Sequence, residues 1–277
     1  MPAAIVTGAS QGIGRAISLR LADDGFDVAV NDIAGRHSEL QSLKAEIESK
    51  GVYLIYRVGD VSVEEDVNQL VEATVEALGH LAVMVANAGI MLTKGMMDLT
   101  MDEWDRVQAV CALPPPLLAI LTRAYGAKVN VKGVFLCYRA AGRQMIAQGN
   151  GGKIIGACSI SGYRPQPTAI AYSVSKWAVR ALTQATAIEF APHGINVNAY
   201  CPGIVKTPMW DQIDDNFSSV HGVPKGHAFE QAVQSRSAMK KPQTPEDIAG
   251  CVSFLASKDS GMITGQSIII DGGIQFS

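Results

Sequence analysis

Two residues four positions apart, Tyr172 and Lys176, could together move a proton. On a helix, that spacing would put both side chains on one face. A free tyrosine has a pKa of about 10, too high for a base near neutral pH. A lysine ammonium beside the phenol, together with a positively charged nicotinamide, stabilises the phenolate and lowers that pKa. The pair could therefore exchange a hydroxyl proton while a hydride passes between a carbinol carbon and nicotinamide.

A glycine-rich turn near the N-terminus could bind the phosphates of such a cofactor. It reads Thr7-Gly8-Ala9-Ser10-Gln11-Gly12-Ile13-Gly14 and lies between an expected strand and an expected helix. Its glycines let the backbone turn sharply and approach a pyrophosphate, whose charge would lie at the helix N-terminus. A turn of this kind also occurs merely to cap a strand, and a Tyr-xxx-Lys pair alone is most often an ordinary surface pair. Both interpretations therefore depend on the surrounding elements.

Short β-branched runs alternate with amphipathic stretches, which predicts a parallel sheet covered by helices on both faces. We expect seven strands, at residues 3–7, 28–32, 53–58, 81–86, 153–157, 196–200 and 267–271. We expect helices at residues 12–24, 38–50, 63–78, 131–148, 171–190 and 245–255. A capping box at residues 100–103 predicts a further helix through Trp104, Val107 and Val110. Residues 1–277 are thus predicted to form a single doubly wound, Rossmann-type α/β domain.

Residues 207–241 interrupt this alternation. They are rich in polar residues, proline and glycine, and lie between a strand and a helix. Loops beyond the carboxyl ends of the strands build the ligand crevice of an open α/β sheet. We therefore expect a substrate lid loop here, with a plain solvent loop as the alternative.

Composition excludes several classes of protein. Hydrophobic residues make up 48% of the chain and charged residues 18%, so a large core can form. The net charge of −3 gives no footprint for nucleic acid or an anionic membrane. The five cysteines lack CxxC spacing and the five histidines lack metal-ligand spacing, so we expect neither disulfides nor a metal. The N-terminus has no signal peptide and no run is long enough to span a bilayer, so we expect a cytoplasmic protein.

Five motifs, in the expected order, resemble those of the short-chain dehydrogenase/reductase family. They are the TGxxxGxG turn, Asp60-Val61 after the third strand, Asn87-Ala88-Gly89 after the fourth, the YxxxK pair, and Pro202-Gly203 followed by Ile204 and Thr207. One position departs from the pattern, because Ala86 stands where the family usually has asparagine. The resemblance covers essentially the whole chain outside residues 111–129 and implies the Rossmann-type fold of NAD(P)-dependent oxidoreductases.

The resemblance also implies roles for individual residues. Ser159, which the family's S-x-x-G spacing selects over Ser161, would hydrogen-bond the substrate oxygen. Asn130 would hold a water in a proton relay, and the chain would form a homotetramer paired through the helices that contain Asn130 and Tyr172. The residues expected at the cofactor are Thr7, Gly8, Gln11, Gly12, Ile13, Gly14, Asp32, Asp60, Val61, Asn87, Ala88, Gly89, Tyr172, Lys176, Pro202, Gly203, Ile204, Val205 and Thr207.

The choice between NAD and NADP can be argued from Asp32. This carboxylate ends the second strand, where it would accept hydrogen bonds from the adenosine ribose and repel a 2′-phosphate. Gln11 is neutral where NADP-preferring relatives often have a basic residue. Arg36 argues the other way, because it could turn towards a phosphate. NAD is favoured, and NADP stays open as the alternative.

The C-terminal half resembles the diacetyl/acetoin reductases, also called 2,3-butanediol dehydrogenases, in residues 152–155, 157–159, 200–210 and 264–273. This implies a small vicinal diketone, hydroxyketone or diol as substrate, with Ile160 and Trp210 in its pocket. Ile160 departs from the polar residue expected in the bacterial members, so polyols, sugars and other ketones remain alternatives. A catalytically silent dinucleotide-binding sensor is the alternative of another class.

Residues 111–129 form an insertion without a counterpart in the family. They include Leu113-Pro114-Pro115-Pro116, and triple proline cannot continue a helix interior. One hypothesis is a retained intron of 19 residues, since valine codons begin with GT and Lys128 could be encoded by AAG. The other interpretation is a genuine excursion, which would disturb Asn130 and weaken activity.

Overall fold

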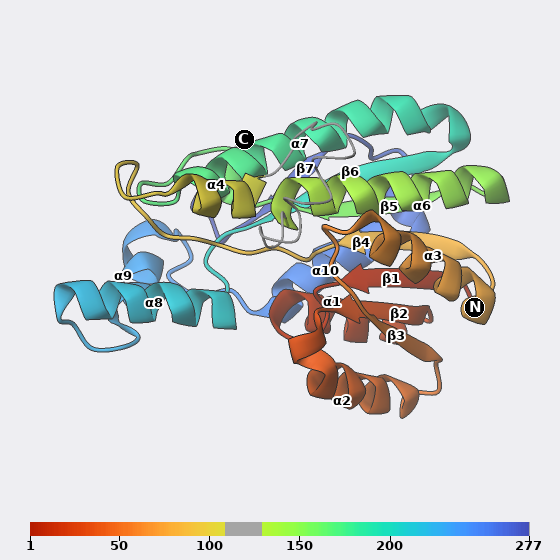
Figure 1. Ribbon diagram of the computed structural model, residues 1–277, viewed down its shortest axis with the longest axis horizontal. Helices are drawn as coiled ribbons and strands as arrows, with labels where there is room; N and C mark the ends of the chain where they lie inside the picture. The colour runs from red at the N-terminus through yellow and green to blue at the C-terminus, as the bar shows by residue number, and fades with distance from the viewer. Residues whose placement is uncertain (109–128, 277) are drawn as a thin grey trace.

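Seven parallel strands form one sheet in the order β3-β2-β1-β4-β5-β6-β7, as seen in the computed structural model, which describes residues 1–108 and 129–276 (Figure 1). The strands are β1 Ala3–Thr7, β2 Asp27–Asp32, β3 Leu54–Val58, β4 Leu81–Ala86, β5 Gly152–Ala157, β6 Ile195–Pro202 and β7 Ser267–Ile270. All seven predicted strands are present, and the predicted fold class is confirmed.

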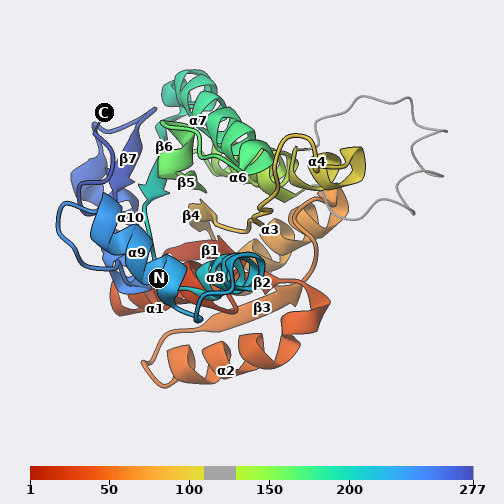
Figure 2. The ribbon, with the colours of Figure 1, turned by 90° about the vertical axis from the view of Figure 1, so that its left-hand side faces the viewer.

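Helices connect the strands and cover both faces of the sheet. Those of the described residues are α1 Gly12–Asp23, α2 His37–Glu48, α3 Glu64–Leu78, α4 Met101–Gln108, α6 Val134–Gln148, α7 Ile170–Phe190, α8 Pro208–His221, α9 His227–Arg236 and α10 Pro245–Ala256. In Figure 2, α1, α2 and α10 lie on one side of the sheet, and α3, α6 and α7 lie on the other. Short helical turns occur at Ala34–Arg36, Val129–Gly133, Ile160–Gly162, Ala191–His193 and Lys258–Ser260.

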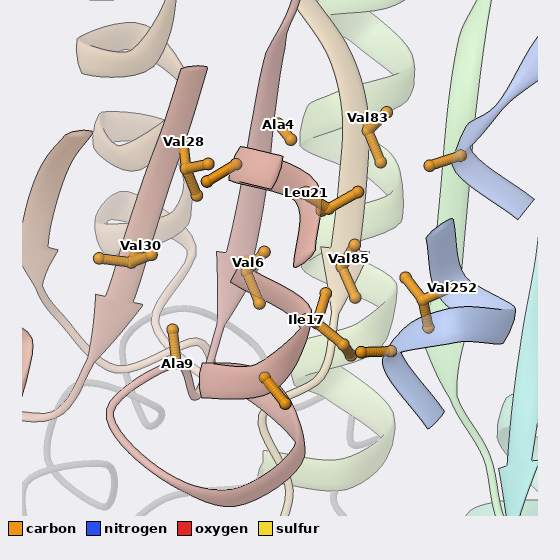
Figure 3. Close-up of a cluster of buried hydrophobic side chains, with 14 of the residues drawn as sticks. Ala4, Val6, Ala9, Ile17, Leu21, Val28, Val30, Val83, Val85 and Val252 are labelled. Carbon is orange, nitrogen blue, oxygen red and sulfur yellow. The ribbon is translucent and has the colours of Figure 1, made fainter. Parts of the chain in front are cut away.

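The alternation of side chains along β1 divides the core into two halves. Ala4 and Val6 belong to the half that packs against α1 and α10, whose Ile17 and Val252 are also fully buried (Figure 3). Ile5 points to the opposite face and joins the half formed with α3, α6 and α7. Because β1 is buried on both faces, its sequence is apolar at every position except its last, as expected of a central parallel strand.

Residues 207–241 do not form the loop that was expected. They fold into α8 and α9, which lie beyond the end of the sheet towards which β1 points (Figures 1 and 2). Pro208 occupies the first turn of α8, where a missing N–H costs nothing. Asp214, on α8, accepts hydrogen bonds from the backbone N–H groups of Gly226 and Phe229, and so holds the start of α9. The prediction of a loop was wrong, because it gave the polar composition of residues 207–241 more weight than these local helix signals. The role of this segment as a substrate lid stays a prediction.

Of the insertion at residues 111–129, only Val129 lies within the described residues. Val110, expected in the helix before the insertion, lies outside them. The predicted capping box that precedes it is present, because Thr100 accepts from the Glu103 N–H and the Glu103 carboxylate accepts from the Thr100 N–H. The predicted helix 131–148 begins three residues late, after a π-helical turn at Val129–Gly133. Within the described part of the chain, no helix is long and apolar enough to cross a membrane.

Candidate active site

The glycine-rich turn after β1 has the backbone geometry that its glycines predict. Gly8 and Gly12 have φ angles of +63° and +55°, in the left-handed region that favours glycine. A Cβ at Gly8 would lie 2.8 Å from the Cα of Ala88. A Cβ at Gly14 would overlap the carbonyl oxygen of Gly8. The turn is therefore packed so closely that both positions require glycine.

Asn87 ties this turn to the loop after β4. Its side-chain amide donates to the carbonyl oxygens of Thr7 and Gly8 at 2.8 and 3.0 Å. Its Oδ1 accepts from the hydroxyl of Tyr200, on β6, at 2.7 Å. The N–H of Ala88 adds a bond to Thr7 Oγ1 at 3.1 Å. The predicted cofactor residue Asn87 is thus also a structural link across three strands, and Tyr200 is a partner that motif spacing did not reveal.

The turn has the features that a dinucleotide pyrophosphate requires. Gln11 is the N-cap of α1 but makes no side-chain cap, so the first N–H groups of the helix remain available for an anion. The buried hydroxyl of Ser10 has no hydrogen-bond partner among the described residues. Thr207, at the start of α8, lies 3.4 Å from where a Gly12 Cβ would be. These residues form a small, polar cradle that fits the phosphates.

Asp32 lies directly beside this cradle. Its Oδ2 accepts a hydrogen bond from the Ser10 N–H at 3.1 Å, and its Oδ1 accepts from the Ile33 N–H at 2.9 Å. Arg36, which could have served a 2′-phosphate, instead donates to Glu39 at 2.9 Å. Asp60 Oδ1 accepts from the N–H of Ser62 at 2.8 Å, which fixes the loop after β3. The Asp32 carboxylate thus contacts the backbone of the turn directly.

Ser159, Tyr172 and Lys176 come together at the carboxyl end of β5. Ser159 follows this strand, and its Oγ accepts from the Ser161 N–H at 3.1 Å. Lys176, 3% exposed, donates from Nζ to the carbonyl oxygen of Ala157 at 2.8 Å. Its Nζ lies 5.3 Å from the centre of the Tyr172 ring. The structure therefore brings these three residues together, although Ser159 and Lys176 are 17 positions apart in the sequence.

Burial dominates the electrostatics of this group. Loss of water raises the pKa of the Tyr172 phenol, and a hydrogen bond with Ser159 offsets part of that rise. Burial also lowers the pKa of Lys176. The direction for Tyr172 is opposite to the one expected from Lys176 and nicotinamide together, because desolvation of the phenolate outweighs the hydrogen bond with Ser159.

Asn130 is fully buried in the π-helical turn before α6, and both polar atoms of its side chain are hydrogen-bonded. Its Nδ2 donates to the Ile90 carbonyl at 2.9 Å and to Ser175 Oγ at 3.1 Å, while Oδ1 accepts from the Ile90 N–H at 2.8 Å. These bonds join the loop after β4 to α7. The disturbed Asn130 expected of a genuine excursion is not seen, because these three bonds anchor it.

Gly203 positions the segment that leads from β6 to α8. Its N–H donates to the Ile270 carbonyl at 3.1 Å and to Gln243 Oε1 at 3.0 Å, and a Cβ there would lie 2.7 Å from that of Asp271. The following residues, Ile204 and Val205, are buried. Gln243, which no motif had singled out, thus holds the segment expected at the nicotinamide.

The two residues expected in the substrate pocket line different cavities. Trp210 stacks edge-on against Phe229 at 5.6 Å and lines a cavity of about 710 Å³ between α8 and α9. Ile160, next to Ser159, lines a separate cavity of about 620 Å³. The structure therefore does not bring Ile160 and Trp210 into one pocket. No group of three or more potential metal ligands occurs among residues 1–108 and 129–276.

Comparison with known proteins gives consistent matches. The family model described as short chain dehydrogenase matches residues 2–217. A short-chain dehydrogenase/reductase of Armillaria gallica is 49% identical, over 99% of this chain and 95% of its own length. An L-2,3-butanediol dehydrogenase of Corynebacterium glutamicum is 39% identical, over 99% of this chain and 98% of its own. The crystal structure of a short-chain type dehydrogenase/reductase from Mycobacterium marinum superposes with a TM-score of 0.84 at 31% identity, covering 100% of this chain and 96% of its own.

Proposed function

Because the chain belongs to the short-chain dehydrogenase/reductase family and is an NAD(P)-dependent oxidoreductase of CH–OH groups, we propose that it interconverts small ketones and secondary alcohols of the diacetyl, acetoin and 2,3-butanediol type, using NAD. One observation supports the proposal most directly. Ser159, Tyr172 and Lys176 meet at the carboxyl end of β5, and the glycine-rich turn lies at the same end of the sheet.

Each residue of this group has a distinct part in the proposed reaction. When bound, nicotinamide supplies the hydride to the carbonyl carbon during reduction, or accepts it during oxidation. Tyr172 Oη gives its proton to the carbonyl oxygen, which becomes the hydroxyl of the alcohol. Ser159 donates a hydrogen bond to the same oxygen. The Lys176 ammonium, held by the Ala157 carbonyl, stabilises the phenolate that remains.

The preference for NAD is supported by the charges around the adenosine end. Asp32 lies beside the turn, and Arg36 is engaged by Glu39. We expect kcat/KM to be at least about tenfold higher with NADH than with NADPH, since the carboxylate would repel a 2′-phosphate. An Asp32→Asn variant should narrow this ratio by raising KM for NADH. Equal efficiencies of the wild-type protein with both cofactors would contradict the assignment.

The substrate class is supported by the 39%-identical butanediol dehydrogenase. The 49%-identical relative bears a name that specifies no substrate. The test is NADH oxidation by the 277-residue chain with diacetyl and acetoin, beside a variant that lacks residues 111–129. We expect turnover of both substrates by at least one form. If both forms bind NADH but reduce only sugars, or with NAD⁺ oxidise only polyols, the substrate assignment is wrong.

A homotetramer paired through α6 and α7 completes the proposal. These helices leave large apolar side chains partly exposed, among them Phe135 at 42%, Trp177 at 45% and Ile188 at 79%. Exposed apolar groups of this size are typical of contact surfaces. Light scattering of the purified protein should give four times the chain mass of 29.3 kDa. A monomer at micromolar concentration would rule the assembly out.

A further inference from the structure

The cavity beside Ser159 has an unusual charge for a site that would accept neutral diketones. It is lined by Ile160, the residue after Ser159, and by the side chains of Arg164, Arg236, Gln166, Ser235 and Gln275. Its lining contains no acidic residue, and its two charged groups are both arginines. The cavity therefore borders the residue that follows the proposed catalytic serine, and it carries an uncompensated positive charge, although Ser159 and Tyr172 do not line it.

Neither arginine is neutralised by the protein. Among the residues that the structure describes, no carboxylate forms an ion pair with Arg164 or Arg236, and neither guanidinium donates a hydrogen bond. The two arginines line the same cavity, and both residues remain exposed to solvent. Partial desolvation and the charge of Arg164 both lower the pKa of Arg236. Two like charges kept together without a counter-ion are destabilising unless an anion joins them.

The backbone that carries Arg164 is held in place. Its N–H donates to the Ile160 carbonyl at 2.9 Å, and its carbonyl accepts from the Gln166 side chain at 3.0 Å. The N–H of Gln166 in turn donates to Ser173 Oγ, on α7, at 3.2 Å. Arg164 is thus fixed between the serine turn and the helix that bears Tyr172.

The backbone that carries Arg236 is held equally well. It is the last residue of α9, and the next residue, Ser237, donates from Oγ to the Gly272 carbonyl at 3.1 Å. Asp271 accepts hydrogen bonds from the N–H groups of Ile274 and Gln275, at 3.1 and 2.6 Å, and so fixes the turn after β7 that lines the same cavity. Both guanidinium groups therefore project from anchored backbone.

We propose that Arg164 and Arg236 bind a negatively charged group, carboxylate or phosphate, on the carbonyl substrate, so that charged ketones are reduced more efficiently than neutral ketones of the same size. This specificity rests on the proposed hydride transfer at Ser159 and Tyr172. Planar guanidinium groups suit such oxyanions because they can donate two parallel hydrogen bonds. The neutral diketones of the proposed function would then be substrates that leave this cavity partly unused.

Matched pairs of substrates test the inference. The carboxylate arm compares 3-oxobutanoate, 4-oxopentanoate and 5-oxohexanoate with their methyl esters, and the phosphate arm compares hydroxyacetone phosphate with hydroxyacetone. We expect kcat/KM to be at least about tenfold higher for one charged member than for its neutral partner, as expected when a charge-assisted hydrogen bond is gained. The chain length that gives the largest ratio measures the span from the carbonyl to the arginines.

Variants separate binding from a general structural effect. Arg164→Gln and Arg236→Gln should each lower kcat/KM for the charged substrate at least about fivefold and leave the neutral one within about twofold. Lys258→Gln, which removes an exposed charge outside the cavity, should change neither. Equal efficiency for charged and neutral partners in the wild type, or equal losses for both in the variants, would overturn the proposal.

A second readout does not depend on turnover. Calorimetric titration of the NAD⁺-bound protein, in which the oxo acid cannot be reduced, should detect binding of the best oxo acid, with binding lost in the Arg164→Gln, Arg236→Gln double variant. If the oxo acid binds to the wild type but neither it nor its ester is reduced, the hydride-transfer proposal fails while the anion site stands. If it binds equally to the wild type and the double variant, the anion site fails whatever the activity.

Discussion

Replacement of Tyr172 by phenylalanine is expected to lower kcat for ketone reduction by about 10²- to 10⁴-fold, the range typical of a lost general acid. The ring would keep its packing beside Lys176, whose Nζ lies 5.3 Å from the ring centre. Only the proton donor would be removed. NADH affinity, measured by fluorescence titration, should therefore stay within about threefold of the wild-type value.

Tyr53→Phe is the matched control, because Tyr53 is 71% exposed and lies remote from the site. It should leave kcat unchanged. Since reduction needs the protonated phenol and burial raises the pKa of Tyr172, reduction should persist at neutral pH and decline only as alkaline pH deprotonates Tyr172. Oxidation, which needs the phenolate, should change in the opposite direction. A Tyr172→Phe protein that turns over normally would remove Tyr172 from the mechanism.

Of the single methyl groups that could be added to the cofactor turn, the one introduced by Gly14→Ala should lower stability and NADH affinity the most. The added Cβ would overlap the Gly8 carbonyl oxygen and also contact the Asn87 amide, so backbone must move. Overpacking of this kind costs about 1–3 kcal/mol of stability. Because the displaced atoms form the phosphate cradle, NADH affinity should fall by at least about 100-fold. Chemical denaturation and NADH titration measure the two effects.

Gly250→Ala is the matched control, for which the same substitution should raise stability instead of lowering it. Gly250 lies inside α10, has no positive φ, and a Cβ there would meet nothing closer than an Arg20 nitrogen at 3.9 Å. Alanine should therefore stabilise the helix by about 0.5–1 kcal/mol and leave NADH affinity unchanged. If Gly14→Ala behaved like this control, the close packing of the turn would not matter for binding.

The sheet could be predicted because its residues repeat a simple rule. Strands such as β1 are apolar at nearly every position, and glycine or a polar residue follows five of the seven strands, so strand number and direction could be inferred. Element ends were less certain: α6 begins at Val134 rather than at 131, since Val129–Gly133 forms a wider turn. Side-chain periodicity does not distinguish these two helical forms at a terminus.

Contacts that join distant segments could not be predicted from spacing. Arg164 and Arg236 are 72 positions apart and meet only because α9 packs against the turn after β7. The helices α8 and α9 were missed for a related reason. Thr207-Pro208 is a helix-start signal, but the acceptor for the α9 N-terminus, Asp214, lies on the preceding helix. Motifs thus selected the proposed catalytic residues and the glycine-rich turn, while the residues that line the two cavities could be found only from the fold.

The sheet order has a consequence for how the chain folds. Every pair of neighbouring strands is consecutive in the sequence except β1 and β4. Pairing them closes a loop that contains β2, β3 and three helices, and such distant contacts form slowly. The glycine turn gains its Asn87 and Ala88 partners only at that step. During refolding, helical structure should thus recover before the ability to bind dinucleotide does, which makes NADH binding a marker for the last closure of the domain.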